Sequence, residues 1–194
     1  MKILKTDKRL IDEGYRYKIE GDLISEGNIN LTDLDKSLYV TGSIKAGRYI
    51  EAGKTIKAGG SIKAGLSIKA GRYIEAGLSI KAGGSIEAGL SIKAGGSIEA
   101  GGYIEAGEYI KAGEYYGITA GLCITAKNTI TAGLKIFAGI CTWRNVSDEE
   151  KTITCTELKG GAIVEHGILN LIGTPKEDEI IELNGKKYKL MESE

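Results

Sequence analysis

The stretch that decides the fold reads LSIKAGGSIEAG and covers residues 78–89. Its six-residue frame runs through residues 44–112, with Ile at every sixth position, and after a shift of two residues at 115–116 it continues through residues 118–138. Ala follows each of the sixteen Ile by two positions, and Gly follows fifteen of them by three. A period this regular indicates a repeat architecture.

The hexads predict short strands separated by corners. On a helix, residues six apart lie about 120° from a common face, and a Gly in every hexad would cost about 1 kcal/mol relative to Ala. In a strand, alternate side chains share a face, so Ile and Ala point inward and the Lys, Glu or Thr between them points outward. Such strands bury their apolar face by stacking on one another. This predicts an all-β protein, a single-stranded parallel β-solenoid (β-helix).

The length of one coil depends on which hexads stack. Three hexads give a triangular coil of about 18 residues, and two give a flattened coil of about 12 residues. Between residues 45 and 111, a spacing of three hexads places opposite charges at the Lys/Glu position in five of nine pairs, whereas a spacing of two hexads does so in four of ten. Like charges on opposite residues are destabilising, so the triangular coil of three hexads is favoured. The alternation of LSIKAG with GSIEAG over residues 78–101 keeps the two-hexad coil as the alternative.

The repeat divides the chain into three parts. Residues 1–41 hold degenerate hexads and are expected to form an N-terminal cap and entry coils, and residues 42–141 form the regular solenoid. Residues 142–194 lose the repeat and predict a small β C-terminal segment that acts as a cap or in oligomerisation. The ends of a solenoid expose backbone and apolar side chains, which is why capping is expected of both flanks.

The C-terminal segment contains several expected strands. Its last two strands flank Asn184-Gly185, a pair typical of a two-residue hairpin turn. The expected strands cover residues 152–156, 162–165, 168–172, 180–183 and 186–190.

Composition excludes several classes of function. The chain has 26 basic and 26 acidic side chains, so its net charge gives no general attraction to nucleic acid or to an anionic membrane. No run approaches the roughly 18 apolar residues of a membrane span, and the first residues lack an apolar signal-peptide core. We therefore expect a soluble, cytoplasmic protein without a membrane partner, whose three Cys are reduced thiols.

Candidate catalytic chemistry is sparse. His166 is the only imidazole and is expected on the surface or in a turn. Cys123 and Cys141 are three hexads apart and would be stacked neighbours in a triangular coil, within the range of a disulfide. No general base lies near any Cys in the sequence, which argues against a nucleophile. We expect no enzyme, and no catalytic residue, cofactor, metal site or small-molecule substrate.

Charge is distributed unevenly along the repeat. Residues 42–83 carry eight basic and two acidic side chains, a net charge of +6, whereas residues 140–194 carry seven and eleven, a net charge of −4. Three of the lysines follow one another at intervals of three hexads and would form one row on one face, and two arginines would flank the row from corners. These candidate interaction residues are Lys45, Lys63 and Lys81, with Arg48 and Arg72. Such a row suits an acidic partner or a phosphate backbone.

Tyrosines supply the second candidate surface. Tyr103, Tyr109, Tyr115 and Tyr116 are close in sequence and coincide with the shift of frame. Exposed Tyr is favoured at recognition surfaces because it offers a large contact area and a hydroxyl group. The alternative is that Tyr replaces Ser at a roomy corner.

The Ile-x-Ala-Gly hexads, together with Ile19-Glu20-Gly21-Asp22-Leu23-Ile24 and Val40-Thr41-Gly42-Ser43-Ile44, resemble the bactofilin type of polymer-forming β-helix. The resemblance covers roughly residues 19–140 and rests on an aliphatic residue followed by Gly or Ala two positions later. It implies end-to-end assembly into non-polar filaments without nucleotide.

Two hypotheses of function follow. The first is a non-enzymatic scaffold that acts by self-association or protein–protein interaction, and we expect a homo-oligomer formed through the flanks. The second is a phage-encoded anti-defence protein, for example an anti-CRISPR inhibitor or adaptor, that binds a host nuclease, another nucleoprotein or nucleic acid.

Overall fold

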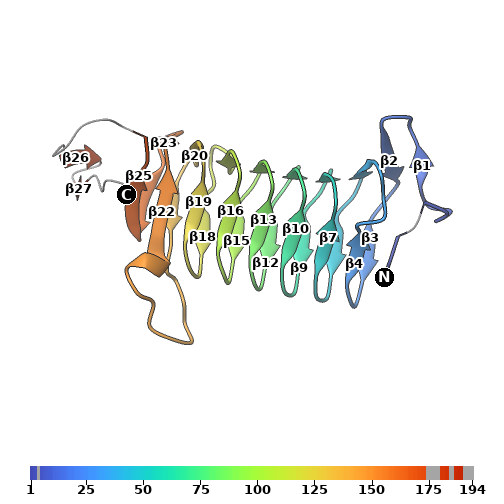
Figure 1. Cartoon of the computed structure of the whole chain (residues 1–194), viewed down its shortest axis with the longest axis horizontal. Coiled ribbons are helices and arrows are strands. Elements are labelled where there is room, and N and C mark those ends of the chain that lie inside the picture. The colour runs from blue at the N-terminus through green and yellow to red at the C-terminus, as the bar shows by residue number, and fades with distance from the viewer. Residues whose placement is uncertain (4, 174–179, 184–185, 190–194) are drawn as a thin grey trace.

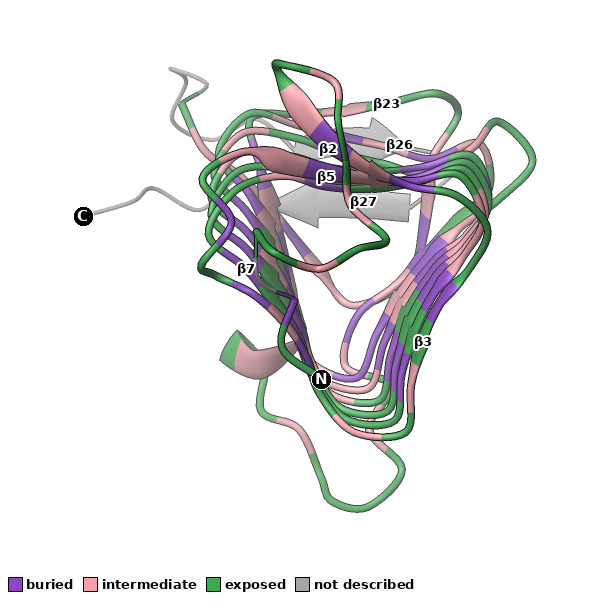
Figure 2. Ribbon diagram, turned by 90° about the vertical axis from the view of Figure 1, so that its right-hand side faces the viewer, coloured by how far each residue is buried: buried purple, intermediate pink, exposed green. Residues whose placement is uncertain are grey.

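Three parallel β-sheets surround a common core in the computed structural model, which describes residues 1–3, 5–173, 180–183 and 186–189. Each regular coil contributes one short strand to each sheet, so the molecule is a rod of stacked coils (Figure 1). Seen along the rod, the coils have a triangular outline (Figure 2). The fold is therefore the all-β parallel solenoid that the hexads predict.

Apart from β1, which pairs with β2 of the same coil, the strands of each sheet follow one another at intervals of one coil. We call the three sheets A, B and C. Sheet A contains β4 (Ile29–Leu31), β7 (Ile50–Ala52), β10 (Ile68–Ala70), β13 (Ile86–Ala88), β16 (Ile104–Ala106), β19 (Ile124–Ala126), β22 (Thr152–Cys155) and β25 (Ile168–Leu171). Sheet B contains β1 (Ile11–Asp12), β2 (Arg16–Ile19), β5 (Ser37–Val40), β8 (Ile56–Ala58), β11 (Ile74–Ala76), β14 (Ile92–Ala94), β17 (Ile110–Lys111), β20 (Thr129–Thr131) and β23 (Glu157–Lys159). Sheet C contains β3 (Leu23–Ser25), β6 (Ile44–Ala46), β9 (Ile62–Ala64), β12 (Ile80–Ala82), β15 (Ile98–Ala100), β18 (Ile118–Ala120), β21 (Lys135–Phe137) and β24 (Ile163–His166).

The register confirms the coil of three hexads and excludes the coil of two. In sheet C, Ile80 lies opposite Ile62 on one side and Ile98 on the other. The Ile side chains of the hexads have no exposed surface, and the Ala side chains keep at most 7 % exposed. Burial of each Ile contributes roughly 1.5–3 kcal/mol, so the stacked Ile columns hold the rod together along its length.

The Gly of the hexad is explained by the close approach of successive coils. A Cβ atom on Gly71 would come within 3.0 Å of the carbonyl oxygen of Gly53, one coil earlier, which is closer than real Cβ atoms come. Gly53 differs, because the nearest atom to its added Cβ is the carbonyl oxygen of Thr32 at 3.4 Å, an ordinary contact. Space between coils therefore selects Gly at this position.

Two insertions interrupt the regular period. The two extra residues at 115–116 lie at the corner between β17 and β18, and the following strands resume their places in the sheets. A longer insertion covers residues 139–151, between β21 and β22, and includes the 3-10 helix η1 (Glu149–Lys151). Among the described residues, no helix is long and apolar enough to span a membrane.

The C-terminal strands continue the solenoid. β22, β24 and β25 form close to the predicted ranges and extend sheets A and C, and β23, which the sequence does not predict, extends sheet B. The predicted hairpin is confirmed, since β26 (Ile180–Leu183) pairs antiparallel with β27 (Lys186–Lys189). Its turn at 184–185 and residue 190 lie outside the described residues.

The N-terminal end of the rod is closed by the chain itself. Lys2 forms a parallel bridge with Asn30 at the edge of sheet A, and β1 pairs antiparallel with β2 at the edge of sheet B. Ile3 and Leu34 are buried there. This arrangement covers two of the three sheet edges at that end with backbone from the same chain.

Candidate interaction surfaces

Sheet C carries the basic row that the sequence predicts. Lys45 lies opposite Lys63, Lys63 lies opposite Lys81, and all three side chains are exposed. The next residue of the row is Glu99, whose carboxylate lies 2.7 Å from Nζ of Lys81. Within the described part of the chain, Lys45 and Lys63 have no carboxylate partner. Two free ammonium groups on adjacent strands, about 4.8 Å apart in backbone spacing, form a place where an anion is attracted.

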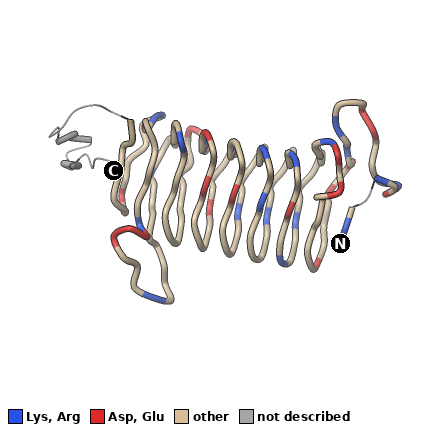
Figure 3. Tube along the Cα trace, in the orientation of Figure 1, with Lys and Arg blue, Asp and Glu red and all other residues tan. Residues whose placement is uncertain are grey.

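The two arginines of the predicted row lie on different edges of the rod. Arg48 follows β6 at the corner between sheets C and A, beside the lysine row. Arg72 follows β10 at the corner between sheets A and B, so it does not flank sheet C, and that part of the expectation is wrong. Each guanidinium lies over the next Tyr ring, Arg48 at 5.9 Å from Tyr49 and Arg72 at 5.7 Å from Tyr73. Figure 3 shows the spread of charge over the coils.

The four tyrosines that are close in sequence do not form a cluster. Tyr103 lies at the corner between sheets C and A, and Tyr109 lies between A and B. Tyr115 and Tyr116 lie between B and C. One hexad turns the chain by one corner, so side chains stack only when a full coil separates them. The expectation of a single tyrosine surface is therefore wrong.

Tyr103 is held by its own solenoid. Its hydroxyl donates a short hydrogen bond to the carboxylate of Glu87, and Nζ of Lys69 lies 2.9 Å from the same carboxylate. The Tyr103 hydroxyl and then Lys69 lower the pKa of Glu87, and the bond to Glu87 raises the pKa of Tyr103. The proton of the Tyr103 hydroxyl is therefore already donated within the protein and is not free for a hydrogen bond to a partner.

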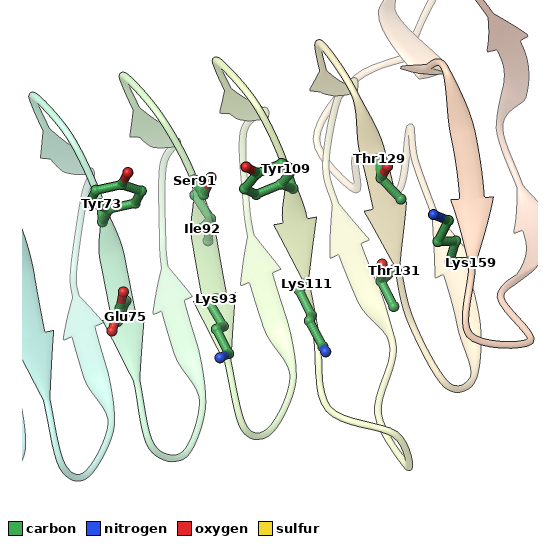
Figure 4. A pocket seen from close by; sticks show the side chains of 10 residues that line it. All are labelled: Tyr73, Glu75, Ser91, Ile92, Lys93, Tyr109, Lys111, Thr129, Thr131 and Lys159. Carbon is green, nitrogen blue, oxygen red and sulfur yellow. The ribbon is translucent and has the colours of Figure 1, made fainter.

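A groove on sheet B brings together two tyrosines from different coils. Tyr73, Ser91 and Tyr109 occupy the same corner position in three successive coils, because Ile74, Ile92 and Ile110 stack in register. The groove has a volume of about 470 Å³. Figure 4 shows a tyrosine on each side of Ser91, with two lysines further along the strands. The complete lining is Tyr73, Glu75, Ser91, Ile92, Lys93, Tyr109, Lys111, Thr129, Thr131 and Lys159.

The charge of this groove is positive. Glu75 is neutralised by Lys57, at 2.7 Å, and Lys159 is neutralised by Glu157, at 2.8 Å. Lys93 and Lys111 lie opposite each other and have no carboxylate partner within the ranges that the structure describes. A hydrogen bond to Glu108 raises the pKa of Tyr109.

The insertion at 139–151 presents the only Trp of the chain. Trp143 is 66 % exposed and Ile140 is 41 % exposed. The insertion leaves the rod beside β22, where the loop is coloured orange in Figure 1. Large exposed aromatic side chains on a protruding loop are typical of protein–protein contacts.

Ion pairs hold this loop in shape. Arg144 donates from both Nη atoms to the two carboxylate oxygens of Glu150, at 2.6 Å each. Ser147 donates its backbone N–H to Glu150 at 3.2 Å, and the N–H of Glu150 donates to the Ser147 hydroxyl at 3.4 Å, as in a capping box. Arg144 first, and then the N–H of Ser147, lower the pKa of Glu150 to about 2. These bonds fix the loop between Arg144 and Glu150, next to Trp143.

The three thiols differ in their surroundings. All three Cys are free, and burial raises the pKa of Cys155 to about 11 and also raises the pKa of Cys123. Cys141 lies in the insertion. Ile153 stacks on Ile124, which places Thr152 rather than Cys141 beside Cys123, so the expected stacking of the two Cys is wrong.

The one imidazole of the chain lies on the surface of the rod. His166 is exposed, as expected, and its Nδ1 lies 2.6 Å from the carbonyl oxygen of Ala138. Among the described residues, no three His, Cys, Asp or Glu side chains are grouped as metal ligands.

Sequence reasoning missed the groove and the Trp143 loop. Tyr73 and Tyr109 are six hexads apart, which is two coils, so the period of three hexads already contained the signal for their stacking over Ser91. The loop has a weaker signal, because the loss of the hexads after Gly139 shows only that the chain leaves the repeat.

The chain matches no protein-family model, no curated protein and no solved structure. Of the expected resemblance to bactofilins, the structure shows the parallel β-helix fold, and no family match supports the finer assignment.

Proposed function

We propose that this protein is a non-enzymatic, rod-shaped scaffold that acts by self-association through its C-terminal end. The observation that carries the proposal is the exposed Trp143 on its braced loop. Trp and Arg are among the residue types most enriched where single side chains dominate binding energy at interfaces, and Arg144 is adjacent. Rigidity of the loop lowers the entropy lost on binding.

The regular core supports a structural role. Ile and Ala fill the interior of the coils, so the outer faces and the ends are the parts that meet other molecules. The raised pKa of the buried Cys155 thiol supports the absence of thiol catalysis. A stiff rod of this kind holds attached surfaces at fixed distances from one another.

The two ends of the rod differ in a way that favours the C-terminal end. The N-terminal edges of sheets A and B are covered by residues of the same chain. At the other end, β23 and β25 are the last described strands of their sheets, and Leu158 and Leu171 on them are partly buried, as Leu10 is at the N-terminal end. The Trp143 loop leaves the rod one coil before this end. A two-fold dimer would bury Trp143 of both copies.

Sedimentation velocity over a range of concentrations tests this proposal. We expect the full chain to dimerise, and Trp143→Ala to weaken the dimer by about thirtyfold or more, which corresponds to about 2 kcal/mol. Tyr15→Ala is the matched control, because Tyr15 is 73 % exposed at the opposite end and its loss should leave the dimer unchanged. A chain that stays monomeric at all concentrations, or a dimer that is indifferent to Trp143, would refute the proposal.

The second candidate function is an inhibitor or adaptor, such as a phage-encoded anti-defence protein, that binds an acidic host protein or nucleoprotein. The free lysines of sheet C favour it, since Lys45 and Lys63 lie side by side with Arg48 at the adjoining corner. Binding through this row should weaken as salt rises, and Lys45→Glu with Lys63→Glu should abolish it. Lys81 is the internal control, because its ammonium group is already paired with Glu99. Lys81→Gln should therefore change the binding affinity little.

A further inference from the structure

We propose that the groove on sheet B binds a nucleotide unit, with the base between Tyr73 and Tyr109 and the phosphate on Lys93 and Lys111. The groove lies on a different part of the rod from the Trp143 loop, and the inference does not depend on self-association. Three observations carry it: a serine that stands between two tyrosines at one corner of the rod, a pair of lysines without an ion-pair partner among the described residues, and the distance between the two.

The first observation is a slot of the right thickness for a planar ring. The N–H of Ile74 donates to the carbonyl of Ser91, and the N–H of Ile92 donates to the carbonyl of Tyr109, both at 3.0 Å. The corner positions of three coils are therefore stacked with the strand spacing of about 4.8 Å. Ser91 has a short side chain with only 7 % of the residue exposed, and the groove lies between the two tyrosines that flank it. A ring placed there lies roughly 4.8 Å from each tyrosine, within the 4.5–7 Å range of aromatic pairs.

The second observation is the pair of lysines. Lys93 and Lys111 are opposite each other on β14 and β17, and both line the groove. Glu75 lies opposite Lys93 in the same row, but its carboxylate is paired with Lys57 on its other side, at 2.7 Å. Two neighbouring ammonium groups repel each other, and an anion between them removes that cost. A phosphate, with a charge that both lysines share, suits this place better than a neutral group does.

The third observation is the spacing between slot and lysines. Lys93 is two residues beyond Ser91 on the same strand, a rise of roughly 6.6 Å. A ribose of ordinary size joins a base to its phosphate over a similar span. Glu108 directly precedes Tyr109 in the chain and lies beside the groove, where its carboxylate accepts from the Tyr109 hydroxyl and, at 3.5 Å, from the Ser91 hydroxyl. A base with an exocyclic amino group can donate a hydrogen bond to Glu108, so adenine is favoured over uracil.

The free nucleotide and the nucleotide within a single strand share this chemistry. The test is titration calorimetry of the full-length chain with adenosine 5′-monophosphate, adenosine without phosphate, uridine 5′-monophosphate and a short oligodeoxyadenylate. We expect saturable binding of adenosine 5′-monophosphate, at least fivefold weaker binding of adenosine, and weaker binding of uridine 5′-monophosphate. If the oligonucleotide binds more tightly per site than the monophosphate, the ligand of the groove is a nucleotide within a single strand. If the two affinities are equal, the ligand is a free nucleotide.

Variants of the groove separate this site from the rest of the surface. Ser91→Tyr fills the slot with the residue that the column already accepts at 73 and 109, so it should abolish binding while the circular dichroism spectrum is unchanged. Tyr109→Ala should weaken binding at least fivefold, in line with the stacking contribution of a base on an aromatic ring. Tyr49→Ala, at another corner of the rod, is the matched control and should have no effect.

The proposal fails if the monophosphate shows no saturable binding up to roughly 5 mM, or if Ser91→Tyr binds as the parent does. Binding that survives Ser91→Tyr but is lost with Lys93→Glu and Lys111→Glu would mean attraction of anions without a base site, which also overturns it. Tighter binding of an acidic peptide that contains Phe, with no binding of the monophosphate, would assign the groove to a protein partner instead.

Discussion

Replacement of one hexad glycine by alanine tests the account of the coil spacing, and Gly71→Ala is the sharpest case. The added Cβ would meet the carbonyl oxygen of Gly53 at less than 3.0 Å and the carbonyl carbon at 3.0 Å. Relief of this contact requires two coils to separate at one corner, where the N–H of Gly71 donates to the carbonyl of Ala52 at 2.9 Å. Overpacking costs about 1–3 kcal/mol and a weakened hydrogen bond about 1 kcal/mol, so we expect a loss of about 2–4 kcal/mol.

Gly53→Ala is the matched control, at the same position of the preceding coil. Its Cβ would have only an ordinary 3.4 Å contact with Thr32, and Ala reduces the entropy of the unfolded chain, so its stability should be equal or slightly higher. Thermal unfolding followed by circular dichroism should show the midpoint of Gly71→Ala lowered by roughly 4–16 °C. Equal midpoints for the two variants would refute the steric explanation of the repeat.

Three further predictions concern charge and thiols. The pKa of Glu150 is lowered from 4.5 to about 2, so its ion pair with Arg144 stabilises the loop fully above pH 4.5 and should be lost as the pH falls to about 2. The fluorescence anisotropy of Trp143 should fall over that pH range in the parent protein. It should not change over that range in the Glu150→Gln variant. Lys63→Glu should raise the unfolding midpoint slightly, because residue 63 then carries a charge opposite to that of its neighbours Lys45 and Lys81. Each opposite-charge pair contributes about 0.2–1 kcal/mol. Cys155 should resist alkylation at pH 8 in the folded protein, whereas unfolding should expose it, as mass spectrometry can follow.

The repetitive part of the fold could be predicted from local pattern alone. Alternation of Ile, Lys and Ala fixes which side chains face inward, and the charges at 45, 63 and 81 belong to one row once three hexads make a coil. The expectation that Arg72 flanks this row is wrong because residues share a corner only when they are a multiple of three hexads apart. Four hexads separate Arg72 from Arg48, which puts the two residues on different corners.

The irregular parts could not be predicted, because they depend on contacts that the repeat does not encode. Because of the insertion after Ala138, the residue that stacks on Ile124 is Ile153 and not residue 142. Nothing local in the sequence gives the length of the inserted loop. Bracing of the loop by Arg144 and Glu150 likewise depends on its folded shape. Trp143 is therefore recognised as exposed only in the structure.

Quenching of Trp143 fluorescence by acrylamide, measured as the protein is concentrated, tests the central claim most directly. The chain has one Trp, so selective excitation reports on this side chain alone. Association through the C-terminal end predicts that the quenching constant falls as the dimer forms and that the Tyr15→Ala variant gives the same curve. A quenching constant that stays high and constant while sedimentation shows a dimer would place the interface elsewhere and contradict the account.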